Sequence, residues 1–197
     1  LRVPARNGLT GAEVARDILR QNGIYDVSIE PQGGTLSDYY DPRRKVVRLS
    51  YDVYNGRSLA AQGVAAHECG HVLQHHQGYA PLAIRNSIVP VAGLGSQMAF
   101  PLFFIGLLFG SEMLMSLGII FFSAAVLFQV ITLPVEYNAS NRAIAVLEGM
   151  GYIDRDEHEP IKKVLGAAAL TYVAATLMAI LQLVRLLVLS GMNRDRR

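Results

Sequence analysis

The chain has 197 residues, of which 51% are hydrophobic and 17% are charged, and its formal net charge is +2. Its lysines and arginines are scattered, which argues against the concentrated basic surface of a nucleic-acid-binding protein. The single cysteine excludes an internal disulfide. Because the second half of the chain holds three long stretches without any charged residue, we interpret the protein as mainly α-helical and integral to a membrane.

The first half of the chain, residues 1–85, is predicted to form a small α+β layer. Thr10 and Glu13 have capping-box spacing at the start of a run with apolar residues on one face, which predicts a short amphipathic helix. The stretches YDVSIE and KVVRLS each have the pattern of a strand. Between them, LSDYYDP is interpreted as a turn held by Asp41 and its following proline, in preference to a metal or sugar site.

The segment 58–78 predicts a helix that carries the motif HECGH. Residues four apart share a face of a helix, so His67 and His71 can bind one ion, whereas Glu68 is poorly aimed to be a ligand. Two histidine ligands with a glutamate between them are a metalloprotease signature. An unpaired glutamate and two histidines would be costly to bury in this apolar helix without a metal, so we predict one zinc ion per chain in preference to a surface helix with scattered histidines.

The predicted chemistry follows from this motif. Zinc lowers the pKa of its bound water toward about 7, and Glu68 takes a proton as that water attacks a polarised peptide carbonyl. The same glutamate then passes the proton to the leaving amine. His75 and His76 lie toward the end of the helix, where we interpret both as cations favoured by the helix dipole. Cys69 points away from the ligand face and is predicted to pack as a small apolar group.

Three uncharged runs, at residues 86–111, 113–135 and 164–184, are each long enough to cross about 30 Å of hydrocarbon as a helix. They lack the polar stripe that helices of a large soluble bundle carry. The short connection around Glu112 joins the first two runs into a hairpin, which returns the chain to the side of the membrane that holds His67.

Glu136 follows directly after the second run, in the segment LPVEYNASNRA. An acid at the end of a membrane span is costly unless a cation compensates it, which makes Glu136 the candidate third zinc ligand. Ser140 lies one turn later and is a candidate for holding a ligand in orientation. The alternative is an acid at the start of a helix just after Pro134, and the segment taken alone favours that alternative.

The stretches HECGH, GTLSDYYDPRRKVVRLS and LPVEYNASNRAI together resemble YugP-type membrane zinc metallopeptidases over nearly the whole chain. The resemblance implies that Glu136 is the third zinc ligand, that a further transmembrane helix precedes Leu1, and that the active site is cytoplasmic at the inner membrane of a bacterium. More distantly, the chain is similar to gluzincins of the HtpX and CAAX prenyl protease type. Their ExxAD segment aligns with residues 136–140, where Ser140 stands in place of the aspartate.

We therefore predict an integral membrane protein with a small zincin-like α+β layer, divided into four segments. They are a membrane-proximal α+β region with the HExxH helix (1–85), a transmembrane hairpin (86–135), a helix with the third zinc ligand and a charged loop (136–163), and a transmembrane helix with a basic tail (164–197). Positive charges on the two sides of the membrane nearly cancel, so charge alone gives no orientation.

The predicted function is a zinc-dependent endopeptidase that cleaves membrane or membrane-proximal proteins. In it, His67, His71 and Glu136 bind zinc and Glu68 activates water. The expected partners are the lipid bilayer, a protein or peptide substrate, and an oligomer or regulatory membrane partner. Arg142 is a candidate for oxyanion stabilisation, with a headgroup-facing or salt-bridged arginine as the alternative.

Two alternative functions are compatible with a metal-binding membrane protein. The first is a non-catalytic zinc-binding scaffold or adaptor, in which four protein ligands would fill every coordination position of the metal. The second is a metal transporter, which would need acidic or histidine residues inside the membrane runs, and residues 86–111 and 113–135 contain none. His158, flanked by acids, is interpreted as a surface residue.

Overall fold

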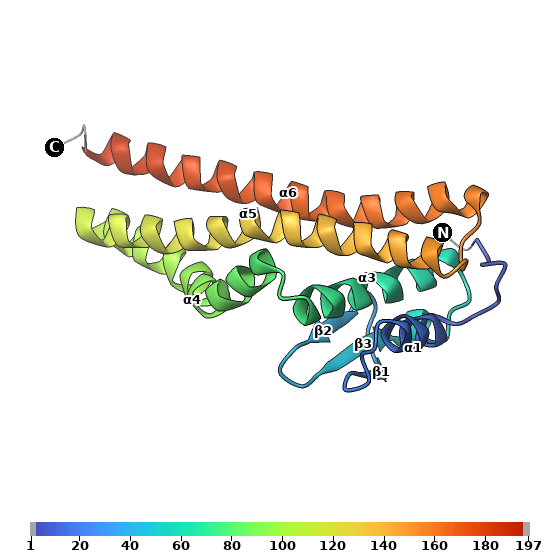
Figure 1. The fold of residues 1–197 in the computed structure, drawn as a ribbon. Coiled ribbons are helices and arrows are strands. Elements are labelled where there is room, and N and C mark those ends of the chain that lie inside the picture. The colour runs from blue at the N-terminus through green and yellow to red at the C-terminus, as the bar shows by residue number, and fades with distance from the viewer. Residues whose placement is uncertain (1–2, 195–197) are drawn as a thin grey trace. The chain divides into compact units, whose positions relative to one another are not determined.

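The computed structural model describes residues 3–194, which form six helices and three strands in two compact units (Figure 1). The first unit comprises residues 3–79 and 136–169, and the second comprises residues 80–135 and 170–194. The two longest helices, α5 and α6, contribute residues to both units. Of the predicted basic tail, residues 195–197 lie outside the described part of the chain.

A three-stranded sheet and two short helices form one layer of the first unit. These elements are α1 (Gly11–Gln21), β1 (Ser28–Gln32), β2 (Tyr39–Asp41), β3 (Val46–Ser50) and α2 (Tyr51–Tyr54). The order of strands is β1-β3-β2, with β1 parallel and β2 antiparallel to β3. Val46, Val47 and Leu49 are buried, so β3 is the central strand and the more polar strands β1 and β2 form the two edges.

The HECGH motif lies on α3 (Leu59–His76), which packs in the core of the first unit (Figure 1). The Ser58 side chain accepts a hydrogen bond from the amide of Ala61 and so caps the start of this helix. The core beneath α3 combines apolar residues from α1, from β3 and from α3 itself: Val14, Ile18, Val47, Leu49, Ala65, Ala66, Cys69, Val72 and Leu73. Burial on this scale holds α3 firmly in place.

Helices α5 (Glu112–Gly149) and α6 (Arg155–Arg194) complete the first unit with their residues 136–149 and 155–169. Small residues on α3 allow both to approach closely. A Cβ on Gly63 would be in ordinary van der Waals contact with Ile161 and Leu165 of α6. A Cβ on Gly70 would lie 2.5 Å from the carbonyl oxygen of Ala139 on α5, so the two backbones touch at this point.

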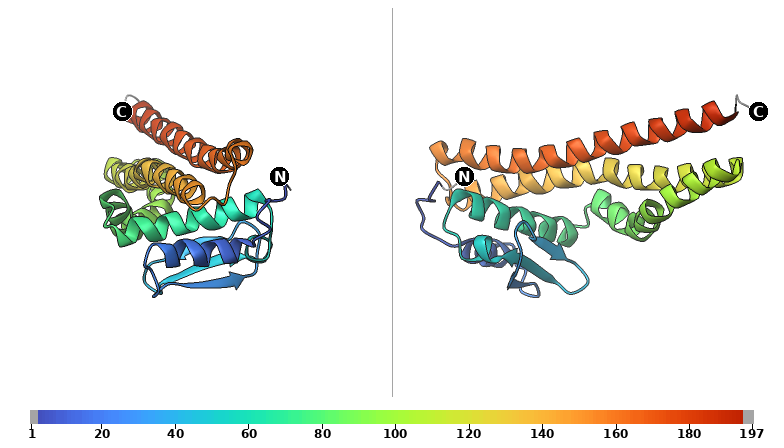
Figure 2. Two further views of the ribbon diagram at one scale, coloured as in Figure 1. Left: turned by 45° about the vertical axis from the view of Figure 1, so that its right-hand side comes forward. Right: turned by 180° about the vertical axis from the view of Figure 1, so that it is seen from behind.

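The second unit consists of α4 (Ala80–Phe109) with residues 112–135 of α5 and 170–194 of α6. Pro90 and Pro101 lie inside α4, which bends along its length (Figure 2). The helices α4 and α5 pack closely where Gly95 meets the Phe121 backbone. Many large apolar side chains point outward, and α4, α5 and α6 are each long and apolar enough to cross a membrane.

The predicted fold class is confirmed: the chain is mainly helical, with three candidate spans and a small sheet. Two boundaries differ from the sequence pattern. Helix α4 begins at Ala80, before the uncharged run, because Pro81 suits the first turn of a helix. Helix α5 continues through Pro134, so Glu136 lies well inside a long helix. The alternative of a helix-start acid at this position is therefore wrong.

Candidate metal centre

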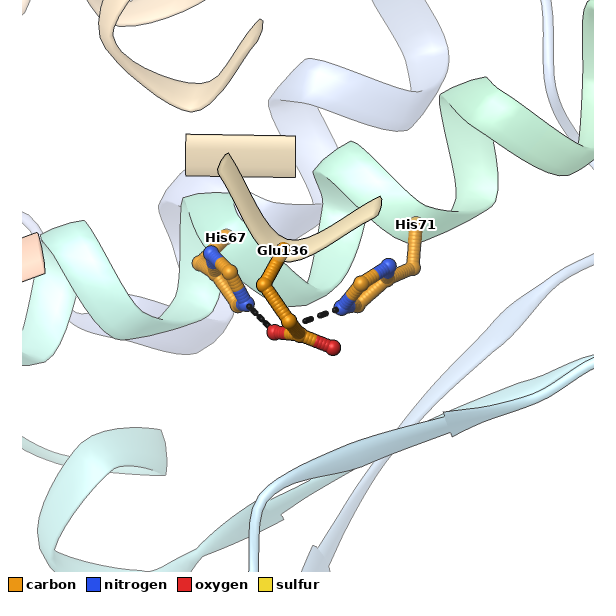
Figure 3. A group of neighbouring side chains, drawn as sticks. All are labelled: His67, His71 and Glu136. Carbon is orange, nitrogen blue, oxygen red and sulfur yellow. Dashed lines mark hydrogen bonds and ion pairs between the residues drawn. The ribbon is translucent and has the colours of Figure 1, made fainter. Parts of the chain in front are cut away.

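His67 and His71 present their rings on the same side of α3 (Figure 3). They are one helical turn apart, and their ring centroids are 4.9 Å apart with an interplanar angle of 85°. This edge-to-face arrangement turns the Nε2 atoms of both rings toward one point beside the helix. The predicted pairing of the two histidines on one face is thus present in the structure.

Glu136 reaches that point from α5 (Figure 3). Its Oε2 atom lies 3.1 Å from Nε2 of His67 and 3.6 Å from Nε2 of His71. One potential ligand atom from each of the three residues lies within 4.8 Å of the others. The Glu136 side chain is almost fully buried, so a carboxylate 69 residues away from His67 in the sequence is held against both imidazoles.

The close contact between α3 and α5 makes this arrangement possible. Gly70 lies on α3 between the two histidines, and Ala139 lies on α5 three residues after Glu136. Because Gly70 has no side chain, the Ala139 carbonyl approaches the α3 backbone directly. A side chain at position 70 would collide with this carbonyl and push α5, which carries Glu136, away from the imidazoles.

The second nitrogen of each ring has its own partner. Nδ1 of His67 lies 3.0 Å from Oγ of Ser140, and Nδ1 of His71 lies 3.0 Å from Oε1 of Gln74. Histidines that bind metals typically use their other nitrogen in this way, which fixes the orientation of the ring. Ser140 therefore lies where the sequence led us to expect an orienting group, although its effect on a ligand stays a prediction.

Gln74 is a site residue that the sequence reasoning missed. It lies three residues after His71, on the same side of α3, and it is 0% exposed. The spacing of three residues on a helix was the available signal, because such pairs are neighbours. Glutamine is also a common helix surface residue, so the spacing alone did not distinguish a buried partner of His71 from a solvated side chain.

Glu68 is buried on α3 directly beside His67. Among residues 3–194, the cluster of side chains able to hold a metal ion contains His67, His71 and Glu136, without Glu68. This agrees with the expectation that Glu68 is too poorly aimed to be a ligand. Its role as the general base stays a prediction.

The other histidines lie outside this cluster. His75 and His76 are exposed at the end of α3, and Nδ1 of His75 lies 2.8 Å from the Tyr40 hydroxyl, within hydrogen-bond distance. His158 lies 3.2 Å from a carboxylate oxygen of Glu148, as a surface ion pair would. None of the three is part of the described metal cluster.

Cys69 and Asp41 also have the structural roles expected of them. Cys69 is fully buried in the core, where burial, with a smaller effect from the charge of Glu68, raises the pKa of its thiol well above the usual range. A thiol in this state is neither a metal ligand nor a nucleophile. Asp41 accepts hydrogen bonds from the amides of Arg43 and Arg44, so it holds a turn.

Two imidazole nitrogens and one carboxylate oxygen are a donor set that zinc binds, and three protein ligands leave a fourth position open for water or substrate. The residues present therefore fit one zinc ion. The neutral side chains that face both Nδ1 atoms add no competing positive charge. His67, His71 and Glu136 thus form a site able to hold a single metal ion.

Comparison with known proteins agrees with this site. Residues 1–191 match the family described as "Putative neutral zinc metallopeptidase". The chain is 53% identical over 194 residues to "Putative membrane protease YugP" of Bacillus subtilis (strain 168), covering 98% of this chain and 86% of that protein. No solved structure matches. The chain therefore belongs to this family of neutral zinc metallopeptidases, as its resemblance to YugP-type proteins predicted.

Proposed function

We propose that this protein is a zinc-dependent endopeptidase that cleaves membrane or membrane-proximal proteins, with His67, His71 and Glu136 as the metal ligands and Glu68 as the general base. The convergence of the two Nε2 atoms on the Glu136 carboxylate is the observation that carries the proposal. Both rings are also bound at Nδ1, as ligand histidines are.

Zinc held there would polarise the peptide carbonyl and lower the pKa of a coordinated water toward about 7. The protein residues then supply orientation and proton transfer. Glu68 accepts a proton from the attacking water and delivers it to the leaving amine. Because Glu68 is buried beside His67, its carboxylate is largely withdrawn from bulk water, which favours transfer to the substrate over exchange with solvent.

The place of Glu136 in the chain supports the proposed substrate class. Glu136 comes directly after residues 113–135, which form an uncharged candidate span, so the third ligand lies next to the end of that span along the chain. The proposed metal site would therefore reach peptide bonds near the membrane surface. We further propose that this surface is cytoplasmic, at the inner membrane of a bacterium.

Cleavage of an unfolded protein such as casein by the detergent-solubilised chain tests the proposed activity. Wild type and Glu68→Gln are compared at equal zinc content, with Glu148→Gln as a matched control, because Glu148 is an exposed glutamate paired with His158. Zinc-dependent cleavage is expected for wild type and for the control. Glu68→Gln is expected to lose at least 100-fold in rate, since general acid–base catalysis contributes about 10²–10⁴-fold.

The result that contradicts the proposal is equal cleavage by Glu68→Gln and wild type. If all three proteins hold zinc and none cleaves casein or a membrane-protein substrate, a scaffold with a structural metal becomes the better interpretation. The orientation has a separate test. Single cysteines at positions 78 and 193, in a Cys69→Ala background, are probed with a membrane-impermeant thiol reagent on intact cells, and protection at position 78 is expected.

A further inference from the structure

A chain of hydrogen bonds runs from His71 to a cation on the neighbouring helix. Nδ1 of His71 lies 3.0 Å from Oε1 of Gln74, and Nε2 of Gln74 donates to Oδ1 of Asn138 at 3.0 Å. The same Oδ1 atom accepts a hydrogen bond from Nε of Arg142 at 2.7 Å. The chain of bonds crosses from α3 to α5, and its four members all lie in the first unit.

The guanidinium group sets the direction of every bond in this chain. Arginine has only donors, so the Asn138 atom that faces Arg142 must be its oxygen. That oxygen can only accept, so Gln74 must turn its amide nitrogen toward Asn138 and its own oxygen toward His71. An oxygen facing Nδ1 of His71 requires a proton on Nδ1, which leaves the lone pair of the neutral ring on Nε2.

Gln74 and Arg142 are both held firmly in this chain of bonds. Gln74 is 0% exposed, so no bulk water competes for its amide. Arg142 is fixed by a second hydrogen bond, from its Nη1 atom to Oε1 of Gln77, and its guanidinium carbon lies 5.7 Å from the centroid of the Tyr79 ring. A guanidinium anchored in this way cannot rotate away without breaking two contacts. Arg142 is therefore occupied by protein groups.

His67 differs from His71 in this respect. Its Nδ1 atom faces the Ser140 hydroxyl, which can donate or accept a hydrogen bond with equal ease. Ser140 thus orients the His67 ring without selecting which nitrogen carries the proton. The hydrogen-bond chain from Arg142 makes that selection for His71 alone.

We propose that Asn138 and Arg142 are positioning residues that act through Gln74 to keep His71 protonated at Nδ1, so that Nε2 is ready to bind the metal. This inference rests on the proposed function only in taking His71 as a ligand. It gives Arg142 a role that differs from oxyanion stabilisation, because the residue acts on a ligand and does not touch the substrate.

Metal affinity tests the chain of bonds without any measurement of catalysis. Cobalt binding is measured by competition with a chelator for wild type and for Asn138→Leu. Asn141→Leu is the matched control, since Asn141 is exposed on the same helix. Asn138→Leu is expected to weaken cobalt binding by about 10–100-fold, the usual effect of losing a group that orients a ligand. Asn138→Asp keeps the accepting oxygen and is expected to bind cobalt like wild type.

A rescue experiment separates positioning from a merely structural role. A carboxylate at position 74 can only accept a hydrogen bond, so it would fix the proton of His71 without help from Asn138 or Arg142. The double variant Gln74→Glu with Asn138→Leu is therefore expected to regain most of the lost affinity. If Asn138 only holds the helices together, Gln74→Glu cannot restore binding, and the inference is overturned.

The outcomes also separate this inference from the proposed function. If wild type binds no cobalt, the proposed metal site is wrong. In that case, nitrogen NMR of ¹⁵N-histidine-labelled protein shows directly which nitrogen of His71 carries the proton. The measurement uses a Glu136→Ala background, which removes the carboxylate facing Nε2. At alkaline pH the His71 ring is expected to carry its proton on Nδ1 and to lose this preference in Arg142→Met. A proton found on Nε2 instead would overturn the inference.

Discussion

The two units of the molecule use their polar and apolar side chains in opposite ways. The first unit packs one apolar core and also buries polar groups such as Gln74 and Glu136, which have partners within the unit. The second unit turns large apolar residues such as Leu108 and Phe109 outward. In water this second pattern would be costly, whereas in lipid it is stable.

The helix α5 shows this change of solvent within one element. Among its residues 112–135 the outward side chains are mainly apolar, whereas residues 136–149 carry the hydrogen-bonding groups of the metal centre. A helix satisfies its own backbone in either solvent. The side chains alone therefore decide which part of the helix belongs to the membrane and which part can hold a polar site.

The largest expected effect comes from Glu136, compared with Glu112 at the start of the same helix. Glu136→Ala removes one of the three proposed ligands. Because a ligand would supply about a third of a zinc-binding free energy of order 10–16 kcal/mol in small zinc domains, affinity should fall by on the order of a thousandfold. Glu112→Ala removes the same group from the exposed start of α5 in the second unit and should leave zinc affinity unchanged. Competition with a chelator measures both. If Glu136→Ala binds zinc as tightly as wild type, Glu136 is not the third ligand.

Exposed apolar residues should also respond differently in the two units. Leu177 on α6 is 56% exposed in the second unit, and Tyr25 is 79% exposed in the first. Lysine in the middle of a membrane helix costs about 3 kcal/mol, so Leu177→Lys should reduce the amount of membrane-inserted protein severalfold. Tyr25→Lys is at a water-facing position and should change stability by less than about 0.5 kcal/mol. Equal membrane yields for the two variants would mean that α6 does not face lipid at Leu177.

Glycines give a third comparison between the units. A Cβ on Gly70 would meet the Ala139 carbonyl at 2.5 Å, whereas a Cβ on Gly93 of α4 would meet nothing within 4 Å. Gly70→Ala should therefore destabilise the protein by about 1–3 kcal/mol and weaken metal binding, because α5 must move away from the histidines. Gly93→Ala should be neutral or stabilising by up to about 1 kcal/mol. Thermal unfolding in detergent, followed by circular dichroism, compares the two, and similar losses would contradict the close helix contact.

Much of this organisation could be predicted from the sequence because it depends on local patterns. The uncharged runs predicted the spans, and the four-residue spacing of His67 and His71 predicted a shared face of a helix. Thr10 and Glu13 form the capping box that their spacing indicated. Each of these features is encoded by residues within a few positions of one another.

The remaining features depend on contacts between distant segments. The sequence favoured Glu136 as the start of a helix, since Pro134 is a typical helix-start residue, and the resemblance to a family was needed to select it as a ligand. The hydrogen-bond chain through Gln74 and Asn138 joins residues 64 positions apart, and no local pattern connects them. Likewise, no local pattern indicated that Ala139 would be the residue lying against Gly70.

The smallest expected effect concerns the partly buried side chain of Tyr40, on an edge strand of the first unit. Burial raises the pKa of Tyr40 to about 12, and the charges of Asp26 and Asp41 add to the shift. The unfolded chain releases this proton near pH 10. The stability that the protonated hydroxyl contributes is therefore fully present below about pH 10 and is lost as the pH rises through 12.

This fall in stability should be absent from Tyr40→Phe, which has no proton to release. Tyr39→Phe is the matched control, because Tyr39 lies next to Tyr40 on β2 and points to the opposite face of the sheet. Chemical unfolding in detergent at several pH values between 9 and 12 gives the slope for each protein. Wild type and Tyr39→Phe should share a steeper decline than Tyr40→Phe. Identical slopes in all three proteins would mean that the Tyr40 hydroxyl is fully accessible to water in the folded state.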